Sequence, residues 1–203
     1  MKKIWEKYEE IETIGSGNYG KVIKAKNKVT GKYVAIKEIN KSKYDNTNQS
    51  LLENIKYINS ENSISIIEII DSKDYLYIVM ELCLISLEKY MEIRNKGLLI
   101  EEINEILIQL NNVFKLIKER NIIDRVFKLS DIFITINNIN RILIKLSCYD
   151  LNIKTNLKNK NDLINAPEIN EYGYIQNKSD IWNLGIIIYY LMNILIKMKM
   201  DLN

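Results

Sequence analysis

The chain has 203 residues, of which 47% are hydrophobic and 27% are charged, so it can form one large domain or two small lobes. Its net charge is only +3 and its basic residues are interleaved with acidic ones, which indicates no nucleic-acid-binding surface. Histidine is absent from the sequence and Cys83 and Cys148 lie far apart, which excludes a zinc site and a serine–histidine–aspartate triad.

The apolar segments of the chain are too short to cross a membrane. The longest of them runs from Leu184 to Ile196 and contains two tyrosines and an asparagine. The start of the chain carries charges where a signal peptide needs an apolar run. We therefore expect a cytoplasmic or nuclear protein that binds neither membranes nor nucleic acids.

The first part of the chain has the pattern of a sheet with one helix. The strand-like pattern begins at Tyr8, and a hairpin turn is predicted at residues 29–32. A helix is predicted at residues 49–59, where Leu52, Ile55 and Ile58 share one face. Four apolar-rich runs predict strands, at residues 21–26, 33–39, 64–70 and 76–81.

From residue 82 onward the pattern is mainly helical. Short strands are predicted at residues 133–136 and 141–146. Helices are predicted at residues 86–95, 101–119 and 180–197. The core face of the second helix is expected to consist of Ile103, Ile106, Leu107, Leu110, Phe114 and Ile117. These elements predict an α+β fold of two lobes, a five-stranded lobe at residues 1–81 and a helical lobe at residues 82–203.

The first lobe carries residues that suit a nucleoside triphosphate. Its glycine-rich hairpin, in which backbone N–H groups can approach phosphates, contains Gly15, Gly17 and Gly20. A strand follows these glycines, which argues against the helix-opening loop of a dinucleotide-binding fold. Val22 can cover an adenine, Lys37 on the next strand can neutralise phosphate oxygens, and Glu53 can pair with Lys37. Each residue alone is ordinary, but their order and spacing together indicate a nucleotide site.

From about Tyr8 to Asn193, the motifs and their order along the chain resemble those of the eukaryotic protein kinase family, of the serine/threonine type. The resemblance implies a bilobal kinase-like fold that binds ATP with Mg²⁺. Further family signatures are matched by Ala166-Pro167-Glu168 and by residues 180–185. By the resemblance, the adenine is covered by Ala35 and Val22, rests on Phe133, lies beside the gatekeeper Met80, and meets the backbone of Glu81 and Cys83.

The sequence departs from the family at the residues that do the chemistry. Arg125 and Lys128 fix the register of the catalytic loop, and the family's aspartate base is replaced by Val126, which cannot accept a proton. Cys148 stands where an aspartate should hold Mg²⁺, and a thiol is a poor ligand for this hard cation. Asp131 replaces the metal-binding asparagine and still offers an oxygen, so any remaining Mg²⁺ site depends on it.

The family places several further helices after the central helix of its second lobe, and the sequence ends at Asn203, before them. The second lobe is therefore expected to be truncated. A helix that is apolar on most faces is normally buried all round. The apolar helix from Asp180 to Lys197 should accordingly expose an apolar patch, which we expect to bind a protein partner.

Three hypotheses about function remain open. The first is a truncated pseudokinase that binds ATP, transfers no phosphate and acts as a scaffold or allosteric partner. The second is a non-functional gene fragment. The third is an active serine/threonine kinase in which Asp124 and Asp150 replace the lost carboxylates. A displacement of two residues moves a carboxylate by several ångströms, and this weighs against the third hypothesis.

Overall fold

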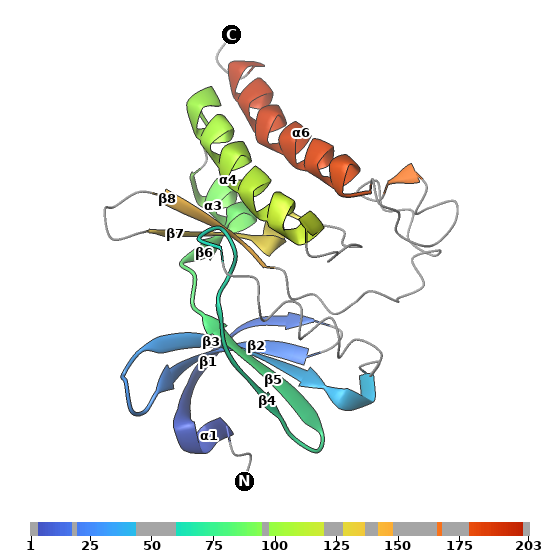
Figure 1. The fold of residues 1–203 in the computed structure, drawn as a ribbon. Helices are drawn as coiled ribbons and strands as arrows, with labels where there is room; N and C mark the ends of the chain where they lie inside the picture. The colour runs from blue at the N-terminus through green and yellow to red at the C-terminus, as the bar shows by residue number, and fades with distance from the viewer. Residues whose placement is uncertain are drawn as a thin grey trace. The chain divides into compact units, whose positions relative to one another are not determined.

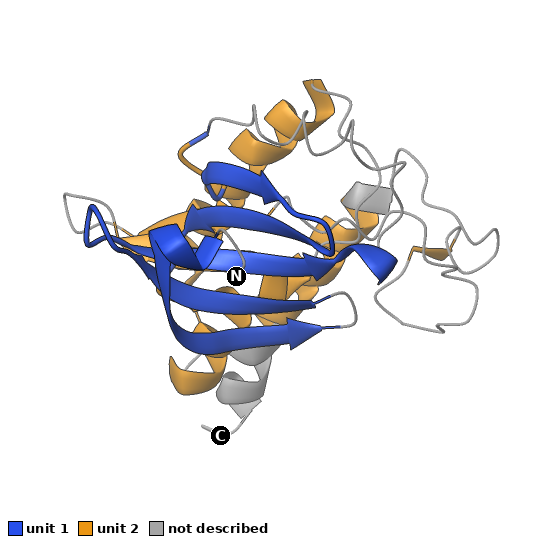
Figure 2. Cartoon of the chain, turned by 90° about the horizontal axis from the view of Figure 1, so that it is seen from below, with its two compact units in different colours: residues 1–60, 64–83 blue, residues 61–63, 84–203 orange. Residues whose placement is uncertain are grey.

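The chain forms two compact units, and we describe each by itself (Figure 2). The first comprises Met1–Ser60 and Ile64–Cys83, and the second comprises Glu61–Ser63 and Leu84–Asn203. The structure is a computed structural model. It describes residues 4–17, 20–43, 60–94, 98–119, 128–136, 142–147, 166–167 and 179–200, with side chains in the last range described at 181–192.

The first unit is built on a five-stranded antiparallel sheet in the order β1-β2-β3-β5-β4 (Figure 1). This confirms the predicted five-stranded lobe. A short 3-10 helix, η1 (Lys41–Lys43), follows β3, and the helix predicted at residues 49–59 lies outside the described residues. The strands are β1 (Tyr8–Gly17), β2 (Gly20–Asn27), β3 (Tyr33–Asn40), β4 (Ile66–Asp71) and β5 (Tyr75–Glu81).

The hairpin between β2 and β3 turns where the sequence predicts it. The side-chain oxygen of Asn27 accepts hydrogen bonds from the backbone N–H groups of Val29 at 2.9 Å and Thr30 at 3.0 Å. Gly31 has a φ of 70°, which glycine adopts at no steric cost. This turn fixes the register of the two strands, in which Val22 lies opposite Lys37.

One face of the first sheet is covered by the short helix α1 (Ile4–Lys7), which the sequence analysis did not predict. Trp5 contacts the ring of Tyr77 edge-on, with 6.4 Å between the ring centroids. A helix of four residues is too short to show a helical period, which explains why it was missed. The buried cluster on this face consists of Ile4, Tyr8, Ile23, Ala25, Val34, Ile36, Tyr77 and Val79.

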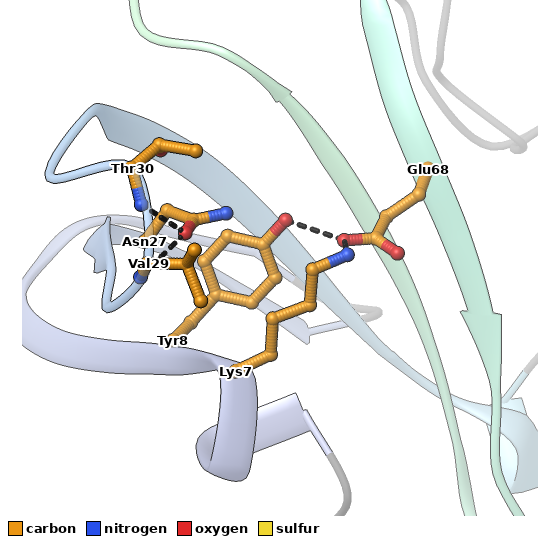
Figure 3. A network of polar contacts seen from close by, with 6 residues as sticks. All are labelled: Lys7, Tyr8, Asn27, Val29, Thr30 and Glu68. Atoms are coloured by element: carbon orange, nitrogen blue, oxygen red, sulfur yellow. Dashed lines mark hydrogen bonds and ion pairs between the residues drawn. The ribbon is translucent and has the colours of Figure 1, made fainter.

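A polar network joins the start of the chain to β4 (Figure 3). The hydroxyl of buried Tyr8 donates a hydrogen bond to the carboxylate of Glu68, and Lys7 Nζ lies 2.7 Å from the same oxygen. Burial and the Glu68 carboxylate raise the pKa of Tyr8 to about 12. Burial alone would raise the pKa of Glu68, but hydrogen bonds from Lys7 and Tyr8 lower it below its usual value. The network therefore links the two edge strands of the sheet, β1 and β4.

The second unit combines helices with a three-stranded sheet in the order β6-β7-β8. The predicted helices are confirmed, and each begins within one residue of its predicted start. The two-residue strand β6 was not predicted. The elements are β6 (Ile85–Ser86), α3 (Leu87–Arg94), α4 (Ile100–Glu119), the 3-10 helix η3 (Leu129–Asp131), β7 (Ile132–Ile136), β8 (Ile142–Leu146) and α6 (Ser179–Met200).

Helix α4 packs its apolar stripe into the core of the second unit. The prediction included Leu107 and Phe114, which are only partly buried, and it missed Val113, which is fully buried. The observed stripe recurs at alternating steps of three and four residues, a narrower seam than the one predicted. Its members are Ile103, Ile106, Leu110, Val113 and Ile117.

The segment Glu61–Ser63 belongs to the second unit, although the chain on both sides of it belongs to the first. The buried Asn62 amide donates hydrogen bonds to the side chain of Gln109 and the carbonyl of Ile144, both at 3.0 Å. Its oxygen accepts a hydrogen bond from Asn112 at 3.4 Å. The Asn62 carbonyl accepts the N–H of Leu146 at 2.8 Å. Asn62 is therefore bonded to both α4 and β8.

Helix α6 buries a narrow face formed by Asn183, Ile187 and Leu191. Large apolar side chains are exposed on its other faces, as the sequence predicts for an apolar helix that is not buried all round. In the part of the chain that the structure describes, no helix is long and apolar enough to cross a membrane. The exposed side chains are Ile181, Trp182, Tyr189, Tyr190 and Met192.

Candidate functional site

The predicted nucleotide-binding residues of the first unit share one face of its sheet. Lys37 on β3 lies opposite Val22 on β2, and Ala35 lies opposite Met80 on β5. Opposed residues of an antiparallel pair, and residues two apart on a strand, point to the same face. The buried cluster around α1 takes the alternate positions, such as Ile36 and Val79. The sheet therefore separates a packed apolar face from the face that carries Val22, Ala35, Lys37 and Met80.

Gly15, Gly17 and Gly20 differ in the space that their surroundings leave for a side chain. A Cβ on Gly20 would lie 1.7 Å from the carbonyl oxygen of Glu38, so no other residue fits there without moving β3. A Cβ on Gly15 would lie 3.7 Å from Val22, an ordinary contact. Among the described residues, no atom lies within 4 Å of a Cβ built on Gly17. Gly20 is thus required by packing, whereas none of the described residues restricts a substitution at Gly17.

The end of β5 is fixed by Glu81. Its N–H donates a hydrogen bond to the carbonyl of Ser65 at 3.0 Å, and its carboxylate accepts the Ser65 N–H at 2.6 Å. Cys83, the last residue of the first unit, is partly exposed and forms no disulfide. These bonds hold the backbone that the family resemblance assigns to the adenine.

In the second unit, Phe133 lies on one face of the three-stranded sheet. Its neighbours across the strands are Lys145 on β8 and Ser86 on β6. Ile132 and Ile134, at the alternate positions of β7, are buried. Lys145 is only 7% exposed, and it was not among the residues predicted from the sequence to form a site. A lone lysine in a strand carries no signal of burial, so only the register reveals that it lies beside Phe133.

The carboxylate of Asp131 takes part in the backbone structure of η3. It accepts the N–H of Lys128 at 3.0 Å, and the Asp131 N–H donates to the Lys128 carbonyl at 3.0 Å. The Asp131 carbonyl also accepts the N–H of Ser147 at 2.8 Å, and Ser147 directly precedes Cys148 in the sequence. Within the described ranges, no group of three or more acidic, cysteine or histidine side chains could hold a metal ion.

The remaining predicted residues lie outside the described residues, and their roles stay predictions. They are Glu53, Val126 and Cys148, together with the displaced carboxylates Asp124 and Asp150. The structure thus groups Val22, Ala35, Lys37 and Met80 on one face in the first unit. In the second unit it places Lys128 and Asp131 together in the turn that leads into β7.

Comparison with known proteins identifies the family. Residues 8–199 match the protein kinase domain. Sperm motility kinase 2B of Mus musculus is 30% identical over 203 residues, covering 95% of this chain and 40% of that protein. The probable serine/threonine-protein kinase nek3 of Dictyostelium discoideum is 34% identical over 207 residues, covering 92% of this chain and 18% of that protein.

Serine/threonine-protein kinase 33 of Mus musculus is 30% identical over 210 residues, covering 93% of this chain and 42% of that protein. The chain therefore spans less than half the length of these three relatives. The kinase-domain match extends from the first strand into α6 and includes both units. The chain belongs to the protein kinase family, and serine/threonine kinases are among its relatives.

Proposed function

We propose that this chain binds ATP but transfers no phosphate, and that it acts by binding another protein. The observation that carries the proposal is the contrast between the two units. In the first, Lys37, Ala35, Val22 and Met80 share a face beside the open Gly17 hairpin. In the second, the Asp131 carboxylate is engaged with the backbone of Lys128.

The residues of the first unit fit a nucleotide. The space beside Gly17 lets backbone N–H groups approach phosphate oxygens, and the Lys37 ammonium supplies a positive charge on the same sheet. Mg²⁺, when bound, neutralises the charge that develops on the transferred phosphoryl group. A valine at position 126 and a thiol at position 148 supply neither a base nor a hard metal ligand. We therefore expect the chain to bind ATP without transferring its phosphoryl group.

The exposed apolar side chains of α6 support the partner part of the proposal. Trp182, Tyr189 and Tyr190 are exposed on a helix that carries few charges. Aromatic residues are enriched at the energetic centres of protein interfaces. We propose that this face binds a protein in the cytoplasm or nucleus, and that neither a membrane nor a nucleic acid is the partner.

Thermal unfolding with ATP tests the binding, with and without Mg²⁺. A ligand at about 100 times its dissociation constant adds roughly 2.7 kcal/mol, or about 5–10 °C for a chain of this length. The shift should be indifferent to Mg²⁺ and should disappear in Lys37→Ala. Absence of a shift in a protein that melts cooperatively would refute ATP binding. A chain without a cooperative melt would instead support the gene-fragment hypothesis.

Family membership favours a second function, an active serine/threonine kinase. In that case the purified chain would transfer phosphate from ATP to a protein hydroxyl. The activity would be lost in Lys37→Ala, and also in Asp124→Asn and Asp150→Asn if these residues supply the missing carboxylates. Transfer that Lys37→Ala abolishes would overturn the pseudokinase proposal.

A further inference from the structure

Strand β1 carries Gly15 and Gly17 at one end and reaches the core only at the other end. Of its ten residues, Tyr8 is the one that is buried, residues 9–14 are exposed, and Gly15 is partly buried. The strand lies at the edge of its sheet, so it pairs with β2 alone. Tyr8 is therefore the single side chain of β1 in the buried cluster around α1.

The pairing of β1 with β2 is interrupted twice between Tyr8 and the glycines. The register shifts within residues 10–12 and again within residues 13–15. A bulge leaves its extra residue unpaired and disrupts the ladder locally. Two ion pairs also join the strands, Lys21–Glu10 at 3.5 Å and Lys24–Glu12 at 3.0 Å. Ion pairs at the protein surface contribute little, so β2 holds the middle of β1 less firmly than an uninterrupted ladder would.

The two limbs of the glycine hairpin are held at different points. On the β2 limb, a Cβ built on Gly20 would lie 1.7 Å from the Glu38 carbonyl oxygen, so this glycine packs directly on β3. On the β1 limb, no described atom lies within 4 Å of a Cβ built on Gly17. The β2 limb is thus fixed at its glycine, whereas the β1 limb is fixed from its far end, at Tyr8.

That far end of β1 is tied down by several polar contacts (Figure 3). The Tyr8 hydroxyl donates a hydrogen bond to the Glu68 carboxylate on β4, and Lys7 Nζ lies 2.7 Å from the same oxygen. The Lys28 N–H donates to the Lys7 carbonyl at 3.0 Å, and Lys28 Nζ donates to the Trp5 carbonyl at 2.7 Å. A hydrogen bond to a carboxylate is stronger than one between neutral groups. Since β4 is the opposite edge strand, the bond to Glu68 anchors β1 across the packed face of the sheet.

We propose that Tyr8 is a positioning residue for the nucleotide, because its bond to Glu68 holds β1 and its glycines in the register that the phosphates require. This inference rests on the proposed binding of ATP. Tyr8 lies in the packed cluster, on the face of the sheet opposite to Lys37, and does not touch the nucleotide. When the anchor is released, β1 opens locally more often. The affinity for ATP then falls with the fraction of the protein that is competent to bind.

Amide hydrogen exchange of the full chain without ligand, followed by mass spectrometry, tests the anchor. Tyr8→Phe keeps the ring and removes the hydroxyl, and we expect residues 9–17 to exchange about tenfold faster in this variant. A side chain that only stabilises the fold would speed exchange at amides that need global unfolding and leave local opening of an edge strand unchanged. Leu76→Val removes a buried methylene group of β5 outside the cluster around Tyr8. It is the control for such a general loss of stability and should leave residues 9–17 unchanged.

Isothermal titration with ATP then tests the consequence for the nucleotide. We expect Tyr8→Phe to weaken ATP binding by about threefold or more. Leu76→Val should leave the affinity unchanged, although it also lowers the melting temperature. Glu68→Ala removes the acceptor and should match Tyr8→Phe, and the double variant should bind no more weakly than either, since both substitutions break one contact. Glu68→Gln keeps an oxygen that can accept the hydroxyl and should recover most of the affinity.

The proposal is overturned if residues 9–17 exchange in Tyr8→Phe as they do in the parent, or if both proteins bind ATP equally tightly. It is also overturned if the effects of Tyr8→Phe and Glu68→Ala add. A parent protein that melts cooperatively but binds no ATP would refute the proposed function, and the positioning role would fall with it. The exchange rates without ligand still measure in that case whether Tyr8 holds β1, so the two failures are distinguished.

Discussion

The five-stranded sheet of the first unit and the three-stranded sheet of the second both have buried apolar residues, but they differ in the contacts that supplement them. The first rests on an apolar cluster around α1 and on a glycine that packs against a backbone carbonyl. In the second, the polar side chains of Asn62, Gln109 and Asp131 bond to strands and turns. A polar side chain that matches a functional residue of the family must therefore be interpreted from the contacts that it makes in its own unit. Asp131 is an example, since one oxygen of a carboxylate predicted to bind metal accepts a backbone hydrogen bond in the turn before β7.

The largest effect is expected at Gly20 in the first unit. Gly20→Ala would place a methyl group 1.7 Å from the Glu38 carbonyl, and β3 would have to shift. We expect a loss of about 3 kcal/mol in the free energy of unfolding, measured with urea. Gly17→Ala is the matched control and should change it by about 0.5 kcal/mol or less. Equal losses in both variants would show that the hairpin glycines are not distinguished by packing.

A smaller effect is expected at Asn62 in the second unit. Asn62→Ala would leave the Ile144 carbonyl and the Gln109 side chain without the donor that they share. We expect a loss of about 2 kcal/mol in the free energy of unfolding, because both groups are buried or partly buried. Asn112→Ala removes only a 3.4 Å contact and should cost less than about 0.5 kcal/mol. If Asn62→Ala is equally mild, polar bonds do not stabilise this unit.

In the network at the edge of the first sheet, Tyr8→Phe should cost about 1.5 kcal/mol, since it removes a hydrogen bond to a carboxylate. The effect should depend on pH. The pKa of Glu68 is lowered from 4.5, so the stabilisation is lost as pH falls through the lowered value. The pKa of Tyr8 is raised from 10.0, so the stabilisation is lost as pH rises through about 12.

Urea unfolding of the parent and Tyr8→Phe across pH measures this dependence. The difference between them should be largest near neutral pH and should shrink toward both extremes. Tyr33→Phe, at an exposed tyrosine of β3, serves as the control and should show no such profile. A pH-independent difference would mean that the contribution of the Tyr8 hydroxyl does not depend on the charge of Glu68.

The smallest effect is expected at Asp131. An asparagine oxygen can accept the Lys128 N–H as a carboxylate does, so Asp131→Asn should change the free energy of unfolding by about 0.5 kcal/mol or less. Asp131→Ala removes the acceptor and should cost about 1 kcal/mol. Thermal unfolding measures both. Equal stability of Asp131→Ala and the parent would argue that this oxygen has no structural role.

The elements with a clear period or turn signal could be predicted from the sequence. The apolar-rich runs at residues 21–26 and 33–39 and the turn predicted at residues 29–32 placed the central hairpin correctly. The four-residue helix α1 and the two-residue strand β6 are too short for any period to appear.

The polar contacts could not be predicted, because their partners are distant along the chain. Asn62 bonds to residues 47 and 82 positions away, and nothing in a chain rich in asparagine marks this one as buried. The roles of Glu68 and Lys145 likewise depend on strand register. Sequence periodicity identifies which residues share an element, whereas these contacts require knowledge of which elements lie side by side.

The three residues Glu61–Ser63 have a consequence for the order of events during synthesis. Asn62 leaves the ribosome 82 residues before Ile144, whose carbonyl accepts a hydrogen bond from the Asn62 side chain. The last of the five strands of the first sheet, β5, ends at Glu81. The strands of this sheet can therefore pair with one another while Asn62 still lacks its partners. Residues 61–63 then lack their hydrogen bonds to β8 until that strand has been synthesised. A ribosome stalled before residue 144 would therefore carry a completed first sheet with one unfinished loop.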